Sequence, residues 1–303
     1  MADAEVILKK IFSLQPNPHD LGLLVEMACV LEVYARKPGN VHPSTGFADT
    51  AFNDFVSSAS AISPVFDQAR WLSTGELIIQ AVRATRQVVD KNTNLGIILA
   101  LAPLAKAPTP DQAAVQRILS ETTVDETRLA YQAIREASPG GLGTAEEQDV
   151  YEVPTVNLLQ AMQMAAERDL IARQYTTAFH DVFHLLLPEL LTQISAQAPL
   201  EQAIIHTFLV GLARLGDTLI FRKCGTVLME ETKRRAGEVL RAGGLGSVQG
   251  REKLRKFDDW LRGDGNRRNP GAMADLLAAT LFLALRRGSI SVPITLPWSC
   301  GTL

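Results

Sequence analysis

Apolar residues recur at helical spacing along most of this chain. The spacing predicts consecutive helices over residues 3–14, 20–35, 52–70, 75–89 and 94–106, separated by short polar or proline-containing breaks. Segments that alternate apolar and polar residues, as a half-buried strand would, are almost absent before the tail. The first half of the chain therefore predicts an all-α fold.

The second half continues the same pattern. Helical spacing covers residues 125–137 and 157–190, and another helix runs from Leu200. The last predicted helix has Asn269 as its cap and Pro270 at its first position, which suits a residue without an N–H. This last helix is almost wholly apolar, so we expect it to lie in the centre of the fold.

Two segments depart from the helical pattern. The tail, residues 289–299, is the one β-like stretch and is expected to fold across the bundle. Residues 138–144 are rich in glycine but follow a helix rather than a strand, so they lack the context of a P-loop or a dinucleotide fingerprint. No internal repeat stands out, so we expect one domain over residues 1–303, a multi-helix bundle with a short extended C-terminal tail.

Four acidic residues stand where these helices call for apolar ones. Glu32 and Asp217 each continue an apolar helix face, and Asp54 shares a face with small residues. Asp275 is the only charged residue in its helix before Arg286. Burying a lone carboxylate costs several kcal/mol, so acids in such positions indicate metal or polyanion chemistry. We expect the four to converge on one cleft.

Basic residues accompany two of these acids in sequence. Cations beside buried acids suit a phosphate-bearing ligand, because the cations hold the phosphates while an acid holds a metal. A polar helix start around Asn94 could also meet an anion, although capping is the simpler role. The candidate phosphate contacts are Arg36, Lys37, Arg214, Arg222 and Lys223.

Simpler roles exist for several of these residues. Glu32 could pair with Arg36 one turn further on, and Asp49 could serve only as the N-cap of the helix that follows it. Asp54 could be solvated. A chain whose acids were all of this kind would be a non-enzymatic helical interaction module.

Composition limits the possible partners. The net charge is -3 and the isoelectric point is near 6.0, which excludes a general nucleic-acid binder. No uncharged apolar run approaches the roughly 20 residues that cross a bilayer, so we expect no membrane segment. Three widely spaced cysteines, Cys29, Cys224 and Cys300, fit a reducing compartment, and the N-terminus does not resemble a signal peptide. These features predict a cytoplasmic protein.

Five motifs, taken together, resemble those of one enzyme family. They are the E-x-x-x-R-K-P-G of residues 32–39 with Asp54 downstream, N-T-N-L-G at 92–96, R-E-A at 135–137, G-D-T at 216–218 leading to Gly225, and N-P-G-A-M-A-D-L-L-A at 269–278. They are similar to motifs of the ATP:dephospho-CoA triphosphoribosyltransferase family, which makes the prosthetic-group precursor of citrate and malonate lyases. The resemblance is spread over most of the chain.

This resemblance implies an all-helical enzyme that binds ATP with Mg²⁺ and transfers its triphosphoribosyl group to a ribose hydroxyl of dephospho-CoA, releasing adenine. It implies an acid or base at Glu32 or Asp54. The implied metal ligands are Asp217, Asp275 and Asp49. The implied ATP contacts are Arg36, Lys37, Gly39, Asn94, Arg214, Thr218, Arg222, Lys223, Asn269 and Gly271.

Two departures from the family's motifs leave the acceptor open. The family's His-Lys pair is Asn94-Leu95 here, which removes a cation, and its Arg-Gly-Gly is Arg222-Lys223-Cys224-Gly225. The chain looks more like a divergent branch, some of whose members serve other cofactor pathways such as one-carbon pterin carriers. An ADP-ribose-type glycohydrolase, in which water replaces the acceptor, is a further alternative. The partners are thus small molecules, and the sequence leaves the oligomeric state open.

Overall fold

The computed structural model describes residues 11–138 and 148–294, and within them it contains helices and no strand. The all-α prediction is confirmed. The helices are α2 (Leu21–Tyr34), α3 (Phe52–Phe66), α4 (Thr74–Val88), α5 (Leu95–Lys106), α6 (Gln112–Ser120), α7 (Val124–Ala137), α8 (Leu158–Ala165), α9 (Leu170–Thr176), α10 (Leu187–Ser195), α11 (Leu200–Leu215), α12 (Thr218–Cys224), α13 (Thr226–Arg241), α14 (Val248–Arg262) and α15 (Gly271–Arg286), with a π-turn at Val182–Leu186 and a 3₁₀ turn at Gly244–Gly246.

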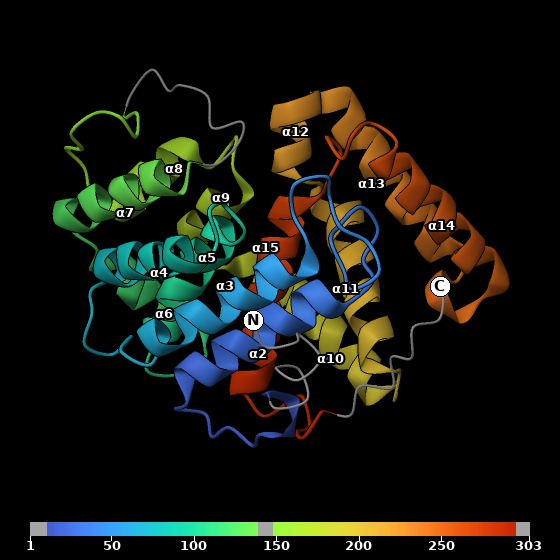
Figure 1. The fold of residues 1–303 in the computed structure, drawn as a ribbon, viewed down its shortest axis with the longest axis horizontal. Helices are drawn as coiled ribbons and strands as arrows, with labels where there is room; N and C mark the ends of the chain where they lie inside the picture. Colours follow the sequence, from blue (N-terminus) through green and yellow to red (C-terminus); the bar gives the residue numbers. More distant parts are fainter. Residues whose placement is uncertain (1–10, 139–147, 295–303) are drawn as a thin grey trace.

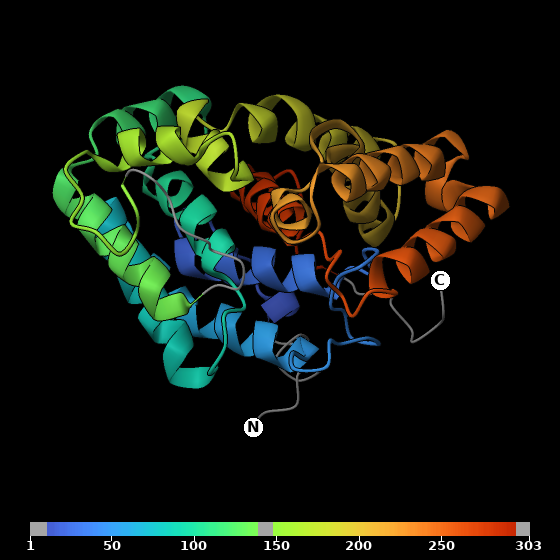
Figure 2. The ribbon, with the colours of Figure 1, turned by 90° about the horizontal axis from the view of Figure 1, so that it is seen from above.

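Helix α15 is the centre of the fold (Figure 1). It packs against α2, α5 and α11, and nearly all of its residues are buried. A helix that is apolar on every side must be surrounded by other elements, as its sequence predicted. Helices α3 to α7 lie on one side of it, and α13 and α14 form the opposite edge of the molecule (Figures 1 and 2). The buried apolar residues form one continuous cluster.

Several predicted helices end or break earlier than their apolar pattern suggests. The helix expected over residues 157–190 is divided, because Asp169 caps the start of α9, and Ala178 and Phe179 adopt left-handed backbone angles that end it. The helix from Leu200 ends at Leu215, where Gly216 takes a positive φ of 75°. Asp217 therefore does not lie on the face of α11, contrary to prediction.

Other helix starts differ by a residue or two. Ala51, not Asp49, precedes the first residue of α3, and Asp54 accepts its backbone N–H at 2.8 Å. The capping role expected of Asp49 thus falls to Asp54. Helix α15 begins at Gly271, one residue beyond the predicted start.

Three sequence expectations fall partly or wholly outside the described residues. The helix expected over 3–14 is described only from Ile11, and residues 139–147 of the glycine-rich segment are not described. The described part of the tail forms no strand, although the N–H of Ile294 donates to the carbonyl of Phe12. Among the described residues no single helix is long and apolar enough to span a membrane; α11 and α12, bent by 56°, pass the length and composition test only as a pair.

The end of α15 is held by a buried arginine. Arg286 is 5% exposed, and its guanidinium donates to the carbonyls of Leu104, Ala107 and Pro108 at 2.9, 2.7 and 3.3 Å. Leu104 is in the last turn of α5, and Ala107 and Pro108 follow that helix. The carbonyls at a helix end have no N–H donors within the helix, so Arg286 supplies them. Arg286 thus joins the central helix to α5, the two helices whose starts lie at the cavity described below.

Replacing Arg286 with Met should lower the free energy of unfolding by about 3 kcal/mol, because buried carbonyls lose their donors. The matched control is Arg287→Met, next in sequence, whose side chain is exposed and donates only to Pro110. Its cost should be about 1 kcal/mol or less. Urea unfolding of the two variants measures the difference, and equal costs would show that Arg286 does not hold the two helices together.

Candidate active site

A cavity of about 540 Å³ lies beside the start of α15. Its walls come from α2, α3, α5, α7, α8, α9, α12 and α15, and from the loops that follow α2, α4, α7 and α8 and precede α15. A cavity of this size is within the usual range for small-molecule sites. Elements far apart in sequence therefore contribute to one enclosed space.

The lining is charged in one part and apolar in another. Helices α7 and α8 contribute mainly apolar side chains, among them Ile134, Leu158 and Met162. Helices α2, α12 and α15 contribute charged groups instead. The charged lining residues are Glu32, Asp49, Lys91, Asp149, Arg168, Asp169, Arg222, Lys223 and Asp275. Since α12 and α7 lie on different sides of α15 in Figure 1, the cavity suits a ligand with an anionic part and a less polar part.

Glu32 lines the cavity from near the end of α2 and is held by a buried lysine. Its Oε1 lies 3.0 Å from Nζ of Lys37, a side chain with no exposed surface. The same ammonium donates to the carbonyls of Glu32 and Ala35. Burial raises the pKa of Glu32 and Lys37 opposes that rise, whereas burial lowers the pKa of Lys37 and Glu32 opposes it. Lys37 thus supports Glu32 and does not line the cavity, contrary to the prediction that it contacts phosphate.

Asp275 is the acid without a counter-ion. It lies on α15 and lines the cavity, and among the described residues its carboxylate has neither an ion pair nor a hydrogen bond. Burial raises its pKa well above the ordinary value, helped by the negative charges of Glu32, Asp217 and Asp169. A β-carbon on Gly96 would collide with this carboxylate, so the glycine at the start of α5 makes room for it. Arg222 acts in the opposite direction but makes no contact with this carboxylate, so a ligand that brings a cation can meet an acid that favours it.

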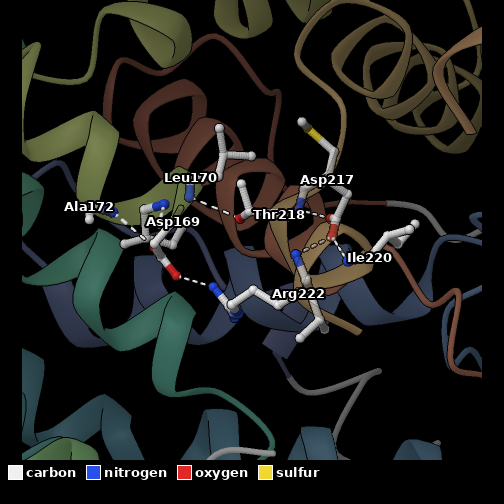
Figure 3. Close-up of polar contacts among 10 residues, drawn as sticks. Asp169, Leu170, Ala172, Asp217, Thr218, Ile220 and Arg222 are labelled. Carbon is white, nitrogen blue, oxygen red and sulfur yellow. Dashed lines mark hydrogen bonds and ion pairs between the residues drawn. The ribbon is translucent and has the colours of Figure 1, made fainter. Parts of the chain in front are cut away.

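Asp217 has a structural position instead. Its Oδ1 accepts the N–H groups of Leu219 and Ile220 at 2.8 and 3.0 Å, which caps α12, and its Oδ2 accepts the N–H of Met273 at 2.8 Å (Figure 3). Burial raises its pKa to about 6. Because both oxygens bond to backbone and Asp217 is not in the cavity lining, we assign it to joining α12 and α15 and not to a metal.

An ion pair between α9 and α12 was missed by the sequence reasoning. Asp169 accepts the N–H groups of Ile171 and Ala172 through Oδ1, while its Oδ2 pairs with Nη1 of Arg222 (Figure 3). Both side chains line the cavity. In the sequence, Asp169 precedes an apolar run, which is the same N-cap pattern as at Asp217. The pattern was overlooked because residues 157–190 were predicted to form one helix.

Asp54 is paired with a lysine of the cavity lining, Lys91. Oδ2 of Asp54 accepts the N–H of Ala51 and lies 3.1 Å from Nζ of Lys91, which also donates to the carbonyl of Asp49. Lys91 and the exposed Asp49 line the cavity, whereas Asp54 does not. Of the four acids expected to converge, Glu32 and Asp275 line the cavity, and Asp54 and Asp217 do not.

Other expected contacts also lie away from the cavity lining. Arg36 pairs with Glu201 of α11, with its Nε and Nη2 at 2.7 and 2.8 Å from the two carboxylate oxygens. Arg214 is exposed and lies outside the lining, as do Thr218 and Gly39; Thr218 instead accepts the N–H of Leu170 through Oγ1. The expected site residues that line the cavity are Glu32, Asp49, Asn94, Arg222, Lys223, Asn269, Gly271 and Asp275.

An all-α fold around a cavity that combines acids with cations defines a protein that handles small, partly anionic ligands. A profile of the ATP:dephospho-CoA triphosphoribosyl transferase family matches residues 18–292. The chain belongs to this family, as its motifs suggested. The match covers every element that lines the cavity.

Individual relatives agree with the family. The chain is 36% identical over 108 residues to a probable 2-(5''-triphosphoribosyl)-3'-dephosphocoenzyme-A synthase of Stutzerimonas stutzeri, and 34% over 105 residues to the synthase of Klebsiella pneumoniae. Each match spans 37% of the relative's length and about a third of this chain. A probable synthase of Vibrio cholerae is 27% identical over 88% of both chains.

A solved structure has a similar fold. It is a putative triphosphoribosyl-dephospho-CoA synthase from Archaeoglobus fulgidus, with a TM-score of 0.59 and 26% identity. The similarity covers 77% of this chain and 99% of the other. The helical arrangement is therefore shared with another protein of the same description.

Replacing Asp275 with Asn should raise the free energy of unfolding by more than about 1 kcal/mol at pH 8, because it removes an acid whose pKa is higher in the folded state than in the unfolded state. The gain should shrink as the pH falls toward the ordinary Asp value of 3.8, since the wild-type carboxyl is then protonated in both states. Asp259→Asn, on the exposed face of α14, should change stability by less than about 0.5 kcal/mol. Denaturant unfolding from pH 4 to 8 measures this, and a loss of stability at every pH would reveal a structural partner for Asp275.

Proposed function

We propose that this protein transfers the 5-triphosphoribosyl group of ATP to a ribose hydroxyl of 3'-dephospho-CoA and releases adenine. The observation that carries the proposal is that Glu32 and Asp275 face the same cavity as Arg222 and Lys223. Acids beside cations meet the needs of a ligand that carries both a triphosphate and a reacting sugar. Family membership and the names of the relatives support the same reaction.

The reaction breaks the bond between ribose C1 and adenine and forms a bond from C1 to the acceptor oxygen. Glu32 accepts the hydroxyl proton, and adenine leaves after taking up a proton. A base works best when its pKa lies near the working pH, and burial moves the pKa of Glu32 in that direction. The positive charge that develops at C1 is stabilised by the negative charge of the acids around it, as in glycoside hydrolysis. We assign the base to Glu32 and not to Asp54, whose carboxylate caps α3 and pairs with Lys91.

The triphosphate lies against α12 in this account. Arg222 and Lys223 extend from its last turn into the cavity, and Lys91 approaches from the loop after α4. Arg222 already pairs with Asp169, so the ion pair holds the guanidinium in place before the nucleotide arrives. Asn269 and Gly271, at the start of α15, complete this end of the cavity.

Mg²⁺ fits this site when it arrives with the nucleotide. No group of three or more His, Cys, Asp or Glu side chains is arranged to hold a metal within residues 11–138 and 148–294. Mg²⁺ commonly uses one or two carboxylates together with substrate phosphates, and Asp275 offers a carboxylate without a protein counter-ion. Asp275 would hold the ion. Asp49, which the sequence also predicted as a metal ligand, lines the same cavity and is the alternative. When bound, the ion would neutralise and orient the triphosphate.

The other candidate activities have less support. The comparisons favour neither a glycohydrolase nor a helical interaction module, and they do not point to a pterin pathway. We place the reaction in the cytoplasm, because Cys29 and Cys224 are free thiols, as a reducing compartment requires.

Adenine release from ATP should depend on both Mg²⁺ and dephospho-CoA and should stop when the metal is chelated. Glu32→Gln and Asp275→Asn should each reduce it by at least about a hundredfold, since they remove the base and the metal carboxylate. Asp54→Asn, whose parent side chain lies outside the lining, should stay within about tenfold of wild type.

Chromatographic assay of adenine, normalised to folded protein, measures these rates. Normalisation matters because Glu32→Gln leaves the ammonium of Lys37 buried without its partner. A large loss in Asp54→Asn with full activity in Glu32→Gln would reverse the assignment, and adenine release that ignores dephospho-CoA would indicate hydrolysis.

A further inference from the structure

Asn40 carries a buried hydrogen-bond donor with no acceptor. The residue is 5% exposed, and its Nδ2 is one of the few buried side-chain atoms without a partner in the described part of the chain. It also lines the cavity. Leaving a buried amide donor unpaired is unfavourable, so such a group in a binding cavity indicates an acceptor that arrives with the ligand.

The backbone around Asn40 fixes this amide in place. Nη2 of Arg262 donates to the carbonyl of Asn40 at 2.6 Å, and Oδ1 of Asp258 accepts the N–H of Gly39 at 2.7 Å. Gly39 has a positive φ of 76°, and a β-carbon there would collide with Leu261. The loop is thus held tightly against α14. The Asn40 side chain cannot move away to find a protein acceptor without breaking these contacts.

A second unpaired donor, on a charged guanidinium, lies in the loop's neighbour Arg262. This donor is Nη1, which is buried and also lacks an acceptor. An acceptor that bears negative charge is therefore favoured over a neutral one.

The loop also lies beside the proposed triphosphate end. A β-carbon on Gly39 would reach Pro270, and one on Gly271 would meet Leu219 of α12. The start of α15 thus separates the loop from α12 by little more than one residue's width, and Figure 1 shows the loop below α12. Asn40 and the cations of α12 line the same cavity near this helix start.

We infer that Nδ2 of Asn40 donates a hydrogen bond to a phosphoryl oxygen of the bound triphosphate, opposite Arg222 and Lys223. This inference rests on the proposed function, because it takes ATP as the ligand. It adds an uncharged contact that selects for a phosphate oxygen at a fixed position. An amide in this role differs from a lysine because it has one rigid direction of donation.

Asn94 provides an internal comparison. It is also buried and lines the same cavity, but both ends of its amide bond to Thr85, at 3.1 and 3.0 Å. The two asparagines therefore have similar burial and opposite hydrogen-bond states. Removing the amide of Asn94 should affect folding, whereas removing the amide of Asn40 should affect binding.

The test uses Asn40→Leu and Asn40→Asp with Mg²⁺ and inorganic tripolyphosphate as the probe, measured by calorimetry. Asn40→Leu should keep the melting temperature of wild type and weaken tripolyphosphate binding at least about tenfold, the usual effect of losing a hydrogen bond to a charged acceptor. Asn40→Asp, which adds a negative charge in nearly the same shape, should weaken it further. Asn94→Leu should instead lower the melting temperature by about 2–4 °C.

Three results would overturn the inference. If wild type turns over ATP but Asn40→Leu binds tripolyphosphate within twofold of wild type, the donor does not meet phosphate and only this inference fails. If wild type binds neither ATP nor tripolyphosphate, the proposed function fails with it. A drop in melting temperature for Asn40→Leu like that of Asn94→Leu would show that the amide is structural.

Discussion

The site depends on one carboxylate whose charge the protein leaves unbalanced. Asp275 lies on α15, the central helix, which packs against α2, α5 and α11, and the nearby acids make its ionisation still less favourable. A buried charge of this kind lowers stability unless a counter-ion supplies compensation. The fold therefore bears an electrostatic cost at its centre that a metal-bound triphosphate would relieve. Stability is commonly reduced in this way at functional sites.

Around that charge, most other ions are neutralised within the scaffold. Lys37 lies beneath Glu32, Arg36 pairs with Glu201, and Asp217 caps α12 while it bonds to the start of α15. These contacts hold α2, α11, α12 and α15 in a fixed relation. The cavity then keeps only a few groups for the ligand, and the protein needs little rearrangement to orient it.

The sequence predicted the fold, and about half of the residues that it singled out line the cavity, for physical reasons that can be named. Glu32 and Asp275 were found because a single acid on an apolar helix face is visible in a periodic pattern. Asp217 was misplaced because a left-handed Gly216 ends α11 before the pattern shows any break. Lys37 and Arg36 are adjacent in a loop with no periodicity, so the pattern could not tell which one is buried. Asn40 gave no signal, since an unsatisfied donor is visible only in three dimensions.

The central claim is that the cavity brings about cleavage at the sugar and leaves the triphosphate intact. Phosphorus NMR of a reaction containing ATP, Mg²⁺ and dephospho-CoA tests this directly, with mass spectrometry of the acceptor. The account predicts three phosphoryl resonances that persist in an unbroken chain, while the acceptor gains the triphosphoribosyl mass and one adenine appears for each acceptor consumed. Formation of ADP, pyrophosphate or orthophosphate in step with turnover, without adenine, would contradict it.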